Sequence, residues 1–129
     1  MSSYRTDLSR ARGLGSAGHG SGHWLSERIT SVALIPLGLW AIYAVLQLAR
    51  LGYEGAFEWL RSPVNAVLMV LTLAISFLHM HHGMRVIIED YIEHKPSRLM
   101  WVLLSAGASL MAAALSIFSV LRVALGAPA

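Results

Sequence analysis

Three long stretches without a formal charge constrain what this chain can fold into. They run from Ile29 to Ala49, from Ser62 to Met84 and from Leu99 to Leu121. At a rise of about 1.5 Å per residue, roughly 20 apolar residues cross a hydrocarbon core about 30 Å thick. We therefore predict an all-α integral membrane protein with three transmembrane helices. The helices are expected at about residues 29–51, 63–90 and 97–123.

The composition agrees with a membrane protein. Of the 129 residues, 56% are hydrophobic and only 13% are charged, which is too apolar for the chain to be enclosed by a soluble shell of its own. The first apolar stretch is not read as a signal peptide, because about 28 polar or small residues precede it and no cleavage site follows promptly. The chain has no Cys, so it can form neither a disulfide nor an Fe–S cluster from its own residues.

The basic residues predict the orientation of the chain. Arg5, Arg10, Arg12 and Arg28 precede the first helix, Arg85, Lys95 and Arg98 surround the second connection, and Arg50, Arg61 and Arg122 belong to the other side. The positive-inside rule then predicts a cytoplasmic N-terminus and an outer C-terminus, N-in/C-out. This distribution explains the net charge of +3 without nucleic acid as a partner.

Three regions follow from this layout: a cytoplasmic segment (1–28), a three-helix transmembrane domain (29–123) and a C-terminal tail (124–129). We expect loops at about residues 52–62 and 91–96, short enough to make consecutive helices antiparallel neighbours. The stretch 13–22 is rich in Gly and Ser and is expected to stay extended or disordered. It is not a phosphate-binding loop, because no strand precedes it.

The chemically informative segment ends the second helix. It reads L-H-M-H-H-G-M-R-V-I-I-E-D-Y from Leu78 to Tyr91. Three histidines within four residues, at the end of an apolar run, are costly in lipid and indicate a functional site. On a helix, His79 and His82 share one face and His81 points nearly opposite.

A haem site is one interpretation of this segment. A neutral imidazole binds haem iron through one nitrogen and donates from the other, and Gly83, one turn from His79, leaves space for a macrocycle. His79 lies deepest and is the best candidate for an axial ligand. Two alternatives stay open: the histidines bond to carbonyls or phosphates at the interface, or His79 and His82 belong to a zinc-type site that lacks its third ligand.

The same residues resemble a known family. His79, Gly83 and Met84 with Asp90-Tyr91, written H-x3-G-M-x5-D-Y, are similar to the smaller membrane anchor subunit of succinate dehydrogenase. The sequences Lys95-Pro96 and Arg98-Leu99-Met100 that follow, and Arg28-Ile29-Thr30 at the start of the first helix, also match that subunit. The three-span layout extends the resemblance over the whole chain.

The resemblance implies an assembly. In the family, a flavoprotein subunit oxidises succinate, an iron–sulfur subunit carries the electrons onward, and two membrane anchor subunits receive ubiquinone. Each anchor subunit supplies one axial histidine to a b-type haem packed between them. Carried over to this chain, that role falls on His79, and the second iron ligand comes from the partner anchor.

The resemblance also implies roles for other residues. Tyr91 corresponds to the tyrosine that hydrogen-bonds a quinone carbonyl, although a tyrosine here also suits an interfacial aromatic belt. Asp90 is either a support for that phenol or a solvated charge at the helix end. Arg28 is suited to a haem propionate, with a headgroup anchor as the alternative. His82 is a second candidate for a propionate, and His23 could join it, while the family pattern assigns no role to His81.

The predicted function is therefore a membrane anchor subunit of succinate dehydrogenase in a bacterial inner membrane, serving the respiratory chain and the tricarboxylic acid cycle. The chain has no catalytic dyad or nucleophile, so catalysis belongs to the assembled complex. One alternative is the anchor of a fumarate reductase-type quinol enzyme. Another is a membrane scaffold without a cofactor.

Overall fold

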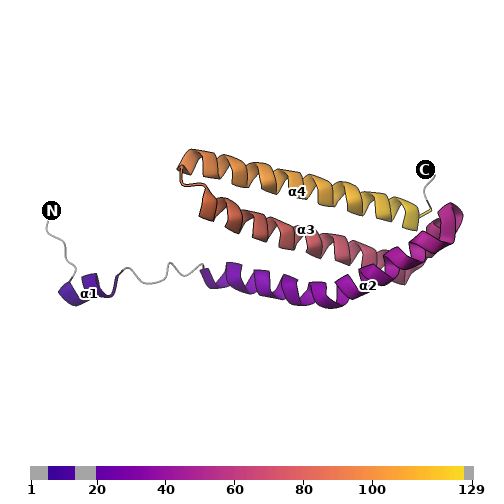
Figure 1. Ribbon diagram of the computed structural model, residues 1–129, viewed down its shortest axis with the longest axis horizontal. Coiled ribbons are helices and arrows are strands. Elements are labelled where there is room, and N and C mark those ends of the chain that lie inside the picture. The colour runs from indigo at the N-terminus through magenta and orange to yellow at the C-terminus, as the bar shows by residue number, and fades with distance from the viewer. Residues whose placement is uncertain (1–5, 14–19, 127–129) are drawn as a thin grey trace.

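The membrane part of the chain consists of three long helices. The computed structural model describes residues 6–13 and 20–126, and all the regular structure in these residues is helical. The helices are α1 (Asp7–Ala11), α2 (Gly20–Arg61), α3 (Pro63–Tyr91) and α4 (Lys95–Ala124) (Figure 1). By length and apolar composition, α2, α3 and α4 can each cross a membrane. The prediction of an all-α fold with three transmembrane helices is confirmed.

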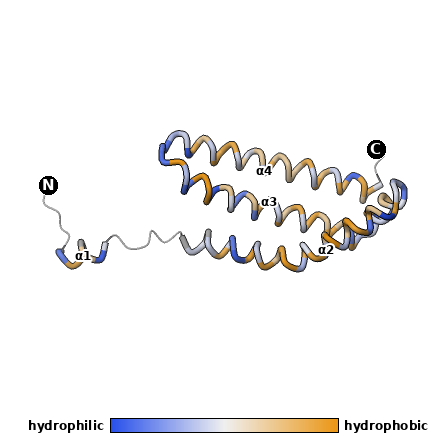
Figure 2. The backbone as a smooth tube through the Cα atoms, in the orientation of Figure 1, coloured by the Kyte–Doolittle hydropathy of each residue, from blue (hydrophilic) through white to orange (hydrophobic). Residues whose placement is uncertain are grey.

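Consecutive membrane helices run antiparallel, with α3 packed against both α2 and α4. The start of α2 lies at the same end of the bundle as the α3–α4 connection, and the α2–α3 turn lies at the other end with the end of α4 (Figure 1). Hydrophilic residues gather toward both ends and hydrophobic ones fill the middle (Figure 2). This banding is what an apolar slab with two aqueous sides requires.

The expected loop at residues 52–62 is mostly helical. Gly52 has φ 66° and ψ −176°, so the helix breaks at this residue and then continues to Arg61. Trp40 and Trp59 stack across the break with ring centroids 6.0 Å apart. In a straight helix these two residues would be about 28 Å apart. The chain therefore turns back sharply at Gly52, and a short helical segment replaces the loop.

Prolines mark the starts of the two later helices. Pro63 opens α3 and Pro96 lies in the first turn of α4, where the missing N–H would have no partner inside the helix. The α3–α4 connection is only residues 92–94. At the other end of the chain, α2 already begins at Gly20, so the end of the Gly- and Ser-rich stretch is helical, and residues 14–19 lie outside the described part.

The interior of the bundle is small. Among the described residues, the buried ones are Thr30, Ala44, Ala66, Ile88 and Ser109, and no large side chain is fully buried. Small residues let helix backbones approach closely, which is how helices associate in lipid. The large apolar side chains stay outside, as Leu39 does with 67% of its surface exposed. This outer surface requires lipid or other membrane helices around it.

Gly52 provides a test of the bend. Its φ and ψ lie in a region open almost only to glycine, so Gly52→Ala should lower the free energy of unfolding by about 1–3 kcal/mol. Gly38→Ala is the control, because Gly38 is helical and a Cβ there meets nothing within 4 Å. Thermal unfolding in detergent, followed by circular dichroism, should show a lower Tm for Gly52→Ala only. Equal Tm values would contradict the role of Gly52.

Candidate functional site

Two histidines of α3 meet two hydroxyl groups of α2. Thr30 Oγ1 lies 3.2 Å from Nδ1 of His79, and Ser26 Oγ lies 3.2 Å from Nε2 of His82. Ser26 and Thr30 are four residues apart and His79 and His82 are three apart, so each pair occupies one face of its helix. The predicted face of α3 that carries His79 and His82 is thus the face packed against α2.

The bonds of Thr30 indicate which nitrogen of His79 carries the proton. The Thr30 hydroxyl lies 3.0 Å from the carbonyl oxygens of both Ser26 and Glu27. A helical Thr commonly donates its proton to such a carbonyl, and these distances are shorter than the one to His79. Thr30 Oγ1 then accepts a hydrogen bond from Nδ1–H of His79. In this tautomer Nε2 keeps its lone pair.

Nε2 of His79 has no hydrogen bond to any residue that the structure describes. The hydrogen bond at the other ring nitrogen, Nδ1, is shielded, because Thr30 is only 8% exposed and little water reaches its hydroxyl. The imidazole is therefore oriented by one nitrogen, and the other is available to a ligand. This is the arrangement that metal-binding histidines use, in which a neighbouring acceptor fixes the ring and its tautomer.

His81 lies on the other side of α3, as its position in the helix predicts. It lines an apolar pocket of about 340 Å³ between α3 and α4, together with Ser109 and small or apolar side chains. Its Nδ1 is buried and bonds to nothing in residues 6–13 and 20–126. His81 is thus separated from the hydroxyl groups of α2 that hold His79 and His82.

Gly83 follows His79 by one helical turn on the same side of α3. A Cβ atom built at Gly83 would have no atom within 4 Å, so the packing of this chain does not require a glycine there. Leu or Ala would favour the helix by up to about 1 kcal/mol. The glycine therefore leaves a flat area beside His79 that another molecule can approach.

Arg28 is not brought to the histidines. It stands between Ser26 and Thr30 in the sequence, two residues from each, so it points to roughly the opposite side of α2. Its guanidinium carbon lies 5.5 Å from the centre of the Trp24 ring, and the residue is exposed. The side chain of His23 lies outside the described part, so its predicted role is not placed.

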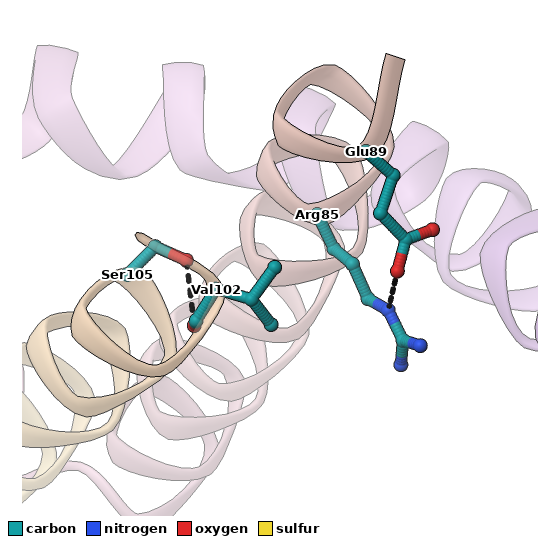
Figure 3. Close-up of polar contacts among 4 residues, drawn as sticks. All are labelled: Arg85, Glu89, Val102 and Ser105. Atoms are coloured by element: carbon teal, nitrogen blue, oxygen red, sulfur yellow. Dashed lines mark hydrogen bonds and ion pairs between the residues drawn. The ribbon is translucent and has the colours of Figure 1, made fainter. Parts of the chain in front are cut away.

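Asp90 and Tyr91 end α3 and are both exposed, Tyr91 by 85%. Twelve residues of helix separate Tyr91 from His79, which is about 18 Å along the axis. Between them, Arg85 Nε donates to Oε1 of Glu89 at 2.8 Å in an exposed ion pair one turn long (Figure 3). In the same view, the Ser105 hydroxyl of α4 bonds to the Val102 carbonyl of its own helix. Neither contact reaches the histidines.

The described residues do not form a closed metal site. In the described ranges, no three His, Cys, Asp or Glu residues are grouped so that they could hold a metal ion. An ion bound at Nε2 of His79 would therefore need further ligands from outside the described residues. Zinc sites built from protein residues alone use three or four ligands.

The partners of the histidines, Ser26 and Thr30, were not identified as site residues from the sequence. A signal for them exists, because two hydroxyl residues at i and i+4 mark one face at the start of an apolar helix. What the sequence could not provide is the register between α2 and α3. The register depends on the turn at Gly52 and decides which residues of α2 face His79.

Comparisons with known proteins now place the chain. Residues 2–118 match the family model described as the succinate dehydrogenase/fumarate reductase transmembrane subunit. The chain belongs to this family. The match covers nearly all of α2, α3 and α4, so the resemblance found in the sequence is confirmed.

Individual relatives agree with the family. The succinate dehydrogenase hydrophobic membrane anchor subunit of Rickettsia conorii is 36% identical over 96 residues, which are 74% of this chain and 76% of the relative. The protein of the same name from Rickettsia felis is 40% identical over 59% of this chain and 64% of its own. The one from Paracoccus denitrificans is 29% identical over 70% of each. No solved structure matches the chain significantly.

Proposed function

We propose that this chain is the haem-carrying membrane anchor of a bacterial succinate dehydrogenase, located in the inner membrane. It ligates a b-type haem jointly with a second anchor subunit and forms part of the site where ubiquinone is reduced. A flavoprotein subunit and an iron–sulfur subunit supply the electrons from succinate. The family match and relatives named as anchor subunits of succinate dehydrogenase support this function.

The observation that carries the haem assignment is the hydrogen bonding of the two ring nitrogens of His79. Its Nδ1 is engaged by a buried hydroxyl group and its Nε2 is not bonded within the part of the chain that the structure describes. An imidazole inside a bilayer is costly unless both nitrogens find partners. Iron at Nε2 would complete the pair, as an axial histidine does for a b-type haem.

The neighbouring residues fit a macrocycle at this position. Gly83 leaves the surface of α3 open beside His79, and His82 lies on the same face, where it can meet a propionate. Arg28 points away from His79, with its guanidinium over the Trp24 ring. It would reach a propionate only if its side chain extended around the edge of α2. When bound, the haem supplies a one-electron redox centre within the bilayer.

The quinone role of Tyr91 is supported by its exposure at the end of α3. A phenol can donate a hydrogen bond to a carbonyl oxygen whose negative charge grows as the quinone is reduced, so it stabilises the reduced form more than the oxidised one. Asp90 is the adjacent carboxylate and can relay a proton to this region. Both side chains are exposed, so another subunit or a quinone can reach them.

The matching family also includes fumarate reductase subunits, so a fumarate reductase anchor is the second candidate. The same residues would serve either direction, since direction depends on the quinone potential and on the catalytic subunits. Steady-state rates of the purified complex with succinate plus ubiquinone, and with fumarate plus quinol, separate the two. A faster fumarate reaction would reject the first candidate.

His79 and His81 form a matched pair for testing the haem assignment. His79→Ala should remove the b-type haem or strongly alter its spectrum, whereas His81→Ala should leave it intact because His81 faces the α3–α4 pocket. The measurement is the reduced-minus-oxidised optical spectrum of the purified complex. The opposite result would overturn the ligand assignment, and a wild-type complex without a b-type α-band would favour the scaffold alternative.

Gly83 tests the space beside His79. Gly83→Leu should leave the helical content of the chain unchanged, because a side chain there meets nothing within this chain. It should lower the haem content per flavin several-fold, since the new side chain occupies the space of the macrocycle. Gly107→Leu on α4, where a Cβ also meets nothing, is the control. Full haem occupancy in Gly83→Leu would exclude a haem packed against this part of α3.

Tyr91→Phe tests the quinone role. Losing a hydrogen bond to a charged group costs about 1.5–3 kcal/mol, so ubiquinone reduction should slow by about 10- to 100-fold. Electron transfer from succinate to an artificial acceptor at the flavin should continue, because that step does not involve the membrane subunits. Tyr53→Phe, at the far end of the bundle, is the control. Normal ubiquinone turnover by Tyr91→Phe would exclude the proposed contact.

A further inference from the structure

We propose that Thr30 is a positioning residue that sets the tautomer and the donor strength of the axial ligand His79. The inference rests on the proposed haem function, because it concerns the same imidazole. It adds a residue of α2 that contacts the ring of the proposed iron ligand directly. The hydrogen bond between α2 and α3 then tunes the iron ligand as well as holding the two helices together.

The hydrogen bond between Thr30 and His79 has a defined direction. The one proton of the Thr30 hydroxyl is directed at backbone carbonyl oxygens of α2, 3.0 Å away. The oxygen therefore faces His79 as an acceptor, at 3.2 Å from Nδ1. The threonine thereby selects the tautomer with Nδ1–H, which is the one that can bind iron through Nε2.

The same hydrogen bond is shielded from water. Thr30 is 8% exposed, so water cannot readily replace its hydroxyl as the partner of Nδ1. A hydrogen bond in such surroundings is stronger than one in water, and an unpaired N–H would be costly. The orientation of the ring is consequently tied to one side chain.

The hydrogen bond at Nδ1 also changes how strongly Nε2 of His79 donates to iron. An N–H that donates to an acceptor makes the imidazole a better electron donor at its other nitrogen, and outer contacts of this kind tune bound metals. A better donor stabilises ferric over ferrous iron. Removing the acceptor should therefore raise the reduction potential of the haem and weaken its retention, by about 10-fold or more in affinity.

The test compares four variants of the complete complex. Thr30→Val keeps the shape of the side chain but loses the acceptor, and Thr30→Ser restores it. Thr72→Val makes the same chemical change at a threonine of α3 whose hydroxyl bonds only to the Leu68 carbonyl of its own helix, at 2.7 Å. Ser31→Ala removes a neighbouring hydroxyl that bonds to the Glu27 carbonyl at 2.8 Å and not to α3.

The readouts are the haem midpoint potential from an optical redox titration, the low-temperature EPR spectrum of the oxidised haem, and the haem content per flavin. Thr30→Val should show a more positive potential, altered g-values and reduced haem content. Thr30→Ser, Thr72→Val and Ser31→Ala should resemble the wild type. Wild-type potential and EPR spectrum in Thr30→Val would overturn the proposal.

Failure of this proposal is separable from failure of the haem assignment. A His79→Ala complex that loses its haem, beside a Thr30→Val complex with an unchanged spectrum, rejects Thr30 alone. A His79→Ala complex with normal haem rejects both. If Thr30→Val does not assemble, a cryo-EM map of the unmutated complex decides. Nδ1 of His79 within hydrogen-bond distance of Thr30 Oγ1 supports the proposal, and Nδ1 bonded to any other group overturns it.

Discussion

The bilayer offers no water to polar groups, and the structure of this chain depends on how it meets that constraint. Backbone groups are satisfied inside three helices. The polar side chains between the helices need partners of their own, and His79 and His82 of α3 find theirs in hydroxyl groups of α2. A hydroxyl that is itself bonded to its helix backbone can accept from an imidazole without leaving any of its own bonding capacity exposed to lipid.

The same constraint explains why the chain belongs in an assembly. Among the described residues, the buried side chains include small ones such as Ala44, Ala66 and Ser109, which let the helices approach closely. The apolar pocket between α3 and α4 lies on the His81 side of α3. A macrocycle held by His79 would therefore need a second membrane subunit to help enclose it.

Much of this could be predicted from the sequence, because the strongest signals are local. Uncharged runs set the number of helices, and helical periodicity placed His79 and His82 on one face and His81 on the other. The helix bounds and the site contacts were harder. Residues 53–61 carry Glu54 and Glu58 between two uncharged runs, which resembles a loop, yet they form a helix whose Trp59 stacks on Trp40. The partners of the histidines depend on helix register, which no local pattern encodes.

The turn at Gly52 determines that register. From Thr30 to Gly52 the helix is about 33 Å long, whereas α3 needs only about 24 Å to reach from Pro63 to His79. The chain must therefore run back along the bundle before α3 begins, and the folded-back segment 53–61 covers this distance. Asn65 Nδ2 fixes the segment by donating to the Trp59 carbonyl at 2.9 Å. The alignment of Thr30 with His79 is thus set by a turn at the opposite end of the bundle.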